Sequence, residues 1–144
     1  MQSVAYLHQR DLVHRDIRPE NVMLEFPSQE GGTIKVKLIG FKEAVEMRGP
    51  SKPALKSQIP LKLYKSNQRH QPMSEPIGPV AQQAPEMISK SYAEKVDIWS
   101  IGIVIYYLLS GEYPFADTDV AKLKFSILNG RYNFKCNNLE NDPT

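Results

Sequence analysis

The segment that decides the fold reads His14-Arg15-Asp16-Ile17-Arg18-Pro19-Glu20-Asn21. It carries a carboxylate at Asp16 and an amide at Asn21, five residues later, joined by a tight loop. The compact apolar run Val22-Met23-Leu24 follows at once and predicts a short strand that leaves the loop. A surface loop with a capping aspartate would contain similar residues. The interpretation of this loop therefore depends on the residues before and after it.

The residues on either side of this loop predict a helix before it and a second strand after it. Residues 1–12 have the pattern of the end of an amphipathic helix. Its expected apolar side consists of Val4, Ala5 and Leu7. Residues Thr33–Ile39 alternate apolar and charged side chains, as a half-buried strand does, and Glu30–Gly32 has the composition of a turn. We therefore expect a small β-hairpin beside the loop.

Residues 81–135 are mostly helical in pattern. Pro85-Glu86 opens a short helix, because proline suits the first turn of a helix. Lys95–Ser110 predicts a long, apolar and buried helix, which Gly111 ends as a C-terminal cap. The fold class that follows is mainly α with a small β-hairpin.

A further helix is expected over Asp119–Asn129, with Asp117 or Thr118 as its N-terminal cap and Gly130 at its end. Residues 136–144 form a polar tail that shows no periodic pattern.

Composition restricts the class of protein. The 144 residues are 41% hydrophobic with a net charge of +2, which suits a single globular domain and does not by itself indicate a nucleic-acid partner. Cys136 is the only cysteine, so no internal disulfide can form, and a reducing, cytoplasmic location is expected. The most apolar run, Ile98–Leu109, has 12 residues and is too short to span a bilayer, so no membrane association is expected.

Residues 46–80 differ in kind from the rest. They contain six prolines, and between Met47 and Ser74 there are six Arg or Lys residues and no acidic residue. This composition predicts a long, basic and mobile loop. Binding of nucleic acid or another acidic partner is an alternative role, but Tyr64 is the only aromatic residue available for base stacking, which favours a solvated loop.

The decisive segment resembles the catalytic loop of eukaryotic-type protein kinases. The resemblance implies that Asp16 is the base that accepts the proton of a substrate hydroxyl and that Asn21 holds a metal ion and contacts the nucleotide. Arg18 stands where these kinases have a phosphate-contacting lysine, and Met23 stands at a nucleotide-contacting position. ATP and Mg²⁺ are the implied cofactors, and a protein is the implied substrate or partner.

Further motifs follow in the family's order. Ala84-Pro85-Glu86 resembles the motif that closes the activation segment, where Glu86 has a structural role. Asp97 resembles the aspartate at the start of the family's central helix, which accepts hydrogen bonds from catalytic-loop amides. His14 and Phe41 resemble members of a packed hydrophobic column. Within the family, the motifs are closest to calmodulin-kinase-like enzymes of the titin and Trio type.

The resemblance assigns residues 1–135 to a partial kinase domain of the C-terminal-lobe type, with the N-lobe absent from the chain. Its parts would be the catalytic loop 13–24, the activation segment 40–86 and the central helix 95–110. Arg15 resembles the arginine that in many kinases grips a phosphorylated residue of the activation segment. The candidate acceptors for such a phosphate are Ser51, Ser57, Ser66 and Ser74.

The sequence departs from an active kinase at several positions. Gly40 replaces the aspartate that ligates magnesium, and Lys42 replaces a flexible glycine. Pro79 or Val80 stands where active enzymes carry a threonine that contacts substrate. No glycine-rich loop and no nucleotide-binding lysine precede the catalytic loop. We expect a pseudokinase that acts as an interaction or regulatory module and does not bind ATP and Mg²⁺ productively. The alternative is part of a genuine Ser/Thr kinase in its full-length form.

Overall fold

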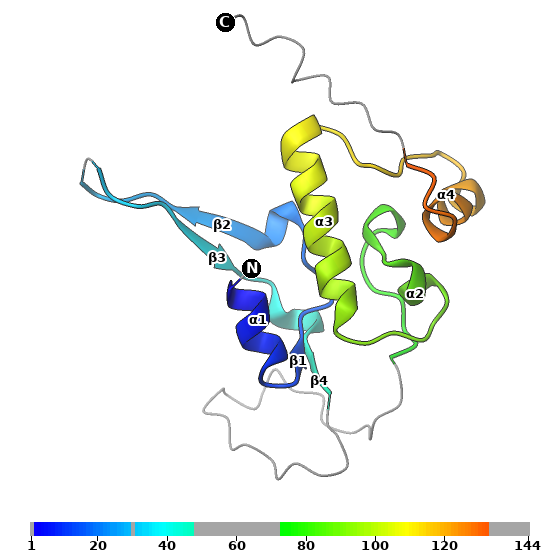
Figure 1. The fold of residues 1–144 in the computed structure, drawn as a ribbon, viewed down its shortest axis with the longest axis horizontal. Coiled ribbons are helices and arrows are strands. Elements are labelled where there is room, and N and C mark those ends of the chain that lie inside the picture. Colours follow the sequence, from blue (N-terminus) through cyan, green and yellow to red (C-terminus); the bar gives the residue numbers. More distant parts are fainter. Residues whose placement is uncertain (1, 30, 48–72, 133–144) are drawn as a thin grey trace, which may run out of the picture.

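The computed structural model describes residues 2–29, 31–47 and 73–132. A central helix, α3 (Lys95–Ser110), separates α1 and the β-hairpin on one side from α2 and α4 on the other (Figure 1). These three helices are α1 (Gln2–His8), α2 (Pro85–Ile88) and α4 (Val120–Leu128). The predictions for the polar tail and for most of the basic loop lie outside the described residues.

The central helix has the predicted bounds. It ends where Gly111 takes a left-handed conformation (φ 77°) and its N–H donates to the Tyr107 carbonyl at 2.8 Å. Glycine suits this position because it has no Cβ to clash there. The short helix α2 also begins at Pro85, as predicted. Within the described residues, no helix is both long and apolar enough to cross a membrane.

The cap of α4 differs from the prediction. Asp119, and not Asp117 or Thr118, is the N-terminal cap, because its side chain accepts hydrogen bonds from the amides of Ala121 and Lys122. Asp117 instead accepts the Asp119 N–H at 2.8 Å, which holds the capping residue directly before the helix. Which of several neighbouring polar residues caps the helix depends on the path of the backbone before the helix. The sequence does not show this path.

The predicted β-hairpin is confirmed, and a second small sheet was not predicted. Strands β2 (Val22–Glu25) and β3 (Lys35–Leu38) pair antiparallel. Strands β1 (Leu12–Val13) and β4 (Val45–Glu46) form the second pair, on either side of the catalytic loop. The chain leaves the loop through β2 and turns back along β3. It then reaches β4, which pairs with β1 directly before the loop.

Three burial predictions were wrong. The central helix is not buried throughout, since one set of its apolar residues is exposed, namely Ile98, Ile105, Leu108 and Leu109. The second strand is not half-buried: Val36 is 63% exposed, and only Leu38 is partly covered. The reason is that the hairpin projects away from the helices, so that its base alone meets α1 and α3 (Figure 1). Ala5 is exposed as well, and the buried side of α1 consists of Val4 and Leu7.

In residues 2–29, 31–47 and 73–132, the core consists of three small clusters rather than one. One lies around α2 and the start of α3, with Val13, Ala84, Met87, Tyr92 and Val96. Another joins α3 to α4, with Ile103, Phe115, Leu123 and Ile127. The third joins α1, the catalytic loop and α3 through Val4, Ile17 and Val104, and it therefore fixes the loop between two helices.

Candidate functional site

The two polar residues that the sequence singles out lie together. The amide nitrogen of Asn21 donates to the Asp16 carbonyl at 2.7 Å and to the Asp16 carboxylate oxygen Oδ2 at 2.9 Å. Both hydrogens of the amide therefore point toward Asp16, and only the Asn21 oxygen stays available to another partner. The Asp16 side chain is 18% exposed, so it lies at a partly open edge.

Arg18 lies on the other side of the same carboxylate. Its Nε is 3.6 Å from Asp16 Oδ1 and 3.8 Å from a carboxylate oxygen of Glu20. Both distances exceed hydrogen-bond length, and this buried Nε has no hydrogen-bond partner among the residues that the structure describes. The guanidinium thus contributes positive charge beside Asp16 without a directed bond.

Gly40 lies directly against Asn21. It has a left-handed backbone (φ 81°), and a Cβ placed on it would overlap the Asn21 side chain. The backbones of the two residues are close because the Ile39 N–H donates to the Asn21 carbonyl at 2.9 Å. The space that a side chain at position 40 would occupy is therefore filled by the amide of Asn21.

Asp97 is fully buried at the start of α3 and holds the catalytic loop by its backbone. Its two carboxylate oxygens accept the N–H groups of His14 at 2.9 Å and Arg15 at 2.8 Å. These are the loop-amide bonds that the sequence predicts for Asp97. Hydrogen bonds to a charged acceptor are among the stronger ones in proteins, so this contact fixes the loop on the central helix.

His8 is a member of this network that sequence reasoning missed. Its Nε2 lies 2.8 Å from Asp97 Oδ2, and because a carboxylate only accepts, the imidazole is the donor. Asp97 therefore receives three donors from α1 and the loop. The sequence offered one signal, a histidine at the end of a helix that leads into the loop, but it did not show which residue His8 meets.

His14 is a packed histidine with both ring nitrogens occupied. Its Nε2 donates to the Ile39 carbonyl at 2.9 Å, and its Nδ1 accepts the Asp16 N–H at 3.3 Å. The Phe41 ring packs edge-on against it, with ring centroids 4.8 Å apart. Since no ring nitrogen is free, His14 cannot serve as a base and acts through packing.

The segment before α2 passes over Asp16. A Cβ on Gly78 would lie 3.4 Å from Asp16 Oδ1, so the backbone there is in contact distance of the carboxylate. Pro79 precedes the short 3-10 helix Val80–Gln82 and contributes no hydroxyl. Gln83 holds the turn, since its side-chain amide donates to the Gly78 carbonyl at 2.8 Å.

The other predicted site residues lie apart from this cluster. Lys42 points outward with a side chain 90% exposed, and its nearest charge is Glu43 at 3.8 Å. Met23 is 52% exposed on β2 and pairs across the hairpin with Lys37. Glu86 lies in the first turn of α2, and the structure assigns no side-chain partner to it within the described residues.

The residues present do not fit a Mg²⁺–nucleotide centre. Magnesium requires nearly octahedral oxygen coordination. Gly40 supplies no ligand, and the Asp16 carboxylate already accepts the Asn21 amide. Asn21 could offer one amide oxygen, which lies where a Cβ on Gly40 would be placed.

Comparison with known proteins identifies the family. The family model for the protein kinase domain matches residues 1–143. The chain is similar to serine/threonine-protein kinase 33 of Bos taurus, with 31% identity over 92% of this chain and 24% of the relative. It is also similar to calcium-dependent protein kinase 4 of Plasmodium berghei, with 30% identity over 93% of this chain and 21% of the relative. The chain thus spans less than a quarter of the length of these relatives. With its catalytic-loop motif held on a central helix, this chain belongs to the protein kinase domain family.

Proposed function

We propose that this chain is a pseudokinase module of the C-terminal-lobe type, which acts by binding a protein and not by transferring a phosphoryl group. The observation that carries the proposal is the contact between Gly40 and Asn21. Phosphoryl transfer depends on positioning and on metal ions that neutralise the phosphates. Here the metal-ligand position has no side chain, and the amide of Asn21 fills its space.

Two further features support the loss of transfer. Arg18 lies beside Asp16 without a directed bond, and its wide guanidinium is harder to place against a transferring phosphoryl group than a lysine ammonium. Pro79 lacks the hydroxyl that would contact a peptide substrate. The packed parts of the motif, His14 and Phe41, remain in contact. The packing of the motif is therefore retained, while its groups for phosphoryl transfer are reduced.

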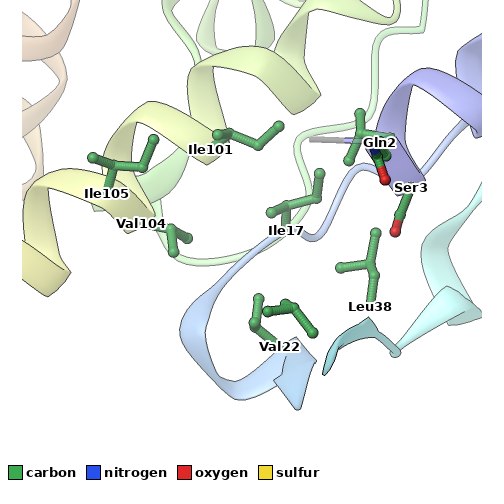
Figure 2. Close-up of a pocket in the computed structure, with 10 residues that line it drawn as sticks. Gln2, Ser3, Ile17, Val22, Leu38, Ile101, Val104 and Ile105 are labelled. Atoms are coloured by element: carbon green, nitrogen blue, oxygen red, sulfur yellow. The ribbon is translucent and has the colours of Figure 1, made fainter. Parts of the chain in front are cut away.

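An apolar groove beside the catalytic loop supports the binding role. Its volume is about 550 Å³, and it lies between the start of α1, the base of the hairpin and one side of α3 (Figure 2). The residues that line it are Gln2, Ser3, Val4, Ile17, Val22, Val36, Leu38, Ile101, Val104 and Ile105. None of them is charged, and exposed apolar surface of this kind marks interaction sites.

The neutral lining argues for an apolar protein segment as the occupant. A charged ligand would lose its hydration in the groove and find no counter-charge there. Ile101 and Ile105 lie one turn apart on α3 and point into the groove, where a partner helix could pack its own apolar side chains against them (Figure 2). An amphipathic helix of a partner protein is therefore the proposed ligand.

The binding role is tested with a labelled amphipathic helical peptide and the whole chain. We expect saturable binding in fluorescence anisotropy, lost in Val36→Glu and in Ile105→Glu, which put a charge on the two walls of the groove. Lys42→Glu, a change on an exposed side chain away from the groove, is the matched control. Equal binding of a peptide with the same composition in scrambled order would argue against a helix site.

The loss of phosphoryl transfer is tested separately. We incubate the chain with labelled ATP, magnesium or manganese, and generic protein substrates, and expect no label transfer. Gly40→Asp alone should not restore transfer, because its side chain must displace Asn21. Transfer by the wild-type chain that disappears in Asp16→Ala would overturn the proposal.

The second candidate is a Ser/Thr protein kinase whose activity belongs to a longer form. The contacts of Asp16 favour it, since this carboxylate meets Asn21 on one side and the Gly78 backbone on the other, in a partly open position. The same transfer assay on a form that contains a nucleotide-binding lysine distinguishes the two candidates. A cytoplasmic location stays a prediction from the single cysteine, and polyanion binding by the basic loop stays a prediction that a salt-dependent binding shift would test.

A further inference from the structure

Tyr92 connects two parts of the site that are far apart in sequence. It is only 3% exposed, and its hydroxyl donates to the Glu75 carbonyl at 2.6 Å. The same hydroxyl lies 3.4 Å from Nη1 of Arg15, which donates to it in a longer bond. Its backbone pairs with Met73 through two hydrogen bonds of 3.1 Å each. Tyr92 thus holds the end of the activation segment by backbone and side chain together.

Arg15 is itself fixed by two hydrogen bonds. Its backbone N–H donates to Asp97, and its Nε donates to the Glu43 carbonyl at 2.6 Å. Its backbone is left-handed (φ 67°), a conformation that a non-glycine residue adopts only when its surroundings enforce it. The side chain therefore reaches Tyr92 from a rigid base.

The partners of the Arg15 side chain are neutral. They are a backbone carbonyl and a phenol, where the family resemblance predicts a phosphorylated residue. Burial raises the pKa of Tyr92, and the neighbouring Arg15 lowers it to a smaller extent. The phenol therefore keeps its proton at neutral pH and stays able to donate to the Glu75 carbonyl.

The contact bears on Asp16 because of the short distance along the chain. Glu75 is three residues before Gly78, whose backbone lies against the Asp16 carboxylate. Fixing the Glu75 carbonyl limits how far Gly78 can move away from Asp16.

We propose that Tyr92 is a positioning residue, a neutral latch that uses Arg15 and the Glu75 carbonyl to hold residues 73–78 across Asp16 without phosphorylation. The latch goes beyond the proposed function, because it concerns the position of residues 73–78 and neither protein binding in the groove nor phosphoryl transfer. It holds for the unmodified chain, whether or not the site transfers a phosphoryl group.

Hydrogen exchange of the whole, unmodified chain tests the latch. Tyr92→Phe removes the hydroxyl and keeps the ring, so we expect the protected amides of residues 73–83 to exchange on the order of tenfold faster. Amides of α3 should be unchanged. Tyr6→Phe, which removes a hydroxyl from a tyrosine that is 54% exposed, is the control and should change neither region. Unchanged exchange in residues 73–83 of Tyr92→Phe overturns the proposal, and so does faster exchange spread evenly over α3 and α4.

Two further measurements separate a latch from simple core packing. Arg15→Lys keeps the charge but not the two-sided donor geometry, so it should speed exchange in residues 73–83, and the double variant with Tyr92→Phe should add little more. Strictly additive effects would overturn the coupling.

Alkaline pH provides the second measurement. Because the folded-state pKa of Tyr92 is raised above 10.0, its contribution to stability is complete below that pH and is lost as the pH rises through the folded-state pKa. Arg15 and Glu75 are the charged groups that act on the phenol. Urea unfolding should therefore show an alkaline loss in the wild-type chain that is smaller in Tyr92→Phe. An equal loss in both would exclude the hydroxyl as its source.

Discussion

Asp97 and Asp16 are two aspartates of one site that are held in opposite ways. Asp97 is fully buried, and its oxygens accept the His8 ring and two loop amides. Asp16 is partly open, accepts one side-chain amide, and has a guanidinium beside it at 3.6 Å. The comparison shows that both carboxylate oxygens of Asp97 are used in internal hydrogen bonds, whereas the Asp16 carboxylate keeps a partly open side.

The difference has a physical cause. Removing Asp97 would leave buried N–H groups without partners, and such groups lose their water and gain nothing in return. Removing Asp16 would free an amide and an arginine that solvent can reach. We therefore expect the Asp97 network to contribute more to the stability of the fold than the contacts of Asp16.

The largest effect is expected from Asp97→Ala. We expect the free energy of unfolding to fall by about 3 kcal/mol, because three donors lose their acceptor in a buried site. Asp16→Ala is the matched change at the open edge and should cost less than about 1 kcal/mol. Urea midpoints of the two variants decide the order. An equal or reversed order would reject the contrast between the two aspartates.

A smaller effect is expected from His8→Ala, which removes one of the three donors to Asp97 and leaves the loop amides in place. The expected loss is about 1–2 kcal/mol, between those of the two aspartate variants. His8→Gln, which can donate from its own amide, should recover part of the loss. A cost of His8→Ala as large as that of Asp97→Ala would mean that the ring, and not the loop amides, dominates the network.

The smallest effects are expected at two neighbours beside Gly40. Phe41→Ala removes the edge-on ring contact with His14 and should cost about 1 kcal/mol, since Phe41 is 39% exposed. Lys42→Ala removes a side chain that is 90% exposed and should leave the urea midpoint unchanged. If Lys42→Ala lowered the free energy of unfolding as much as Phe41→Ala, the charge of Lys42, and not the packing of Phe41, would stabilise this segment.

Several elements could be predicted because their signals are local. The central helix followed from an apolar run closed by Gly111, and the hairpin followed from two short runs with a turn between them. The tight loop that joins Asp16 to Asn21 followed from their spacing of five residues. In each case, the residues that make the contact are neighbours in sequence, so backbone geometry restricts where they can lie.

Predictions failed where the answer depended on which surface a residue meets. The alternation in β3 predicted a buried face, but the strand projects from the fold, and Val36 stays exposed. Asp119 caps α4 although Asp117 and Thr118 had equal claims by type. The sequence pattern indicates which residues could be buried in a strand or could cap a helix. Tertiary packing decides which of them are buried or act as caps.

What the sequence by itself determined is the set of local elements, the order of the motifs that resemble those of kinases, and the absence of a side chain at Gly40. Only the tertiary structure decided which residues meet across the chain. His8 reaches Asp97 over 89 positions, and Arg15 reaches Tyr92 over 77. Nothing in either neighbourhood specifies these pairs, because contacts at such separation follow from how α1, the loop and α3 pack together. The filling of the Gly40 space by Asn21 has the same origin, since it depends on the side-chain direction that packing leaves open.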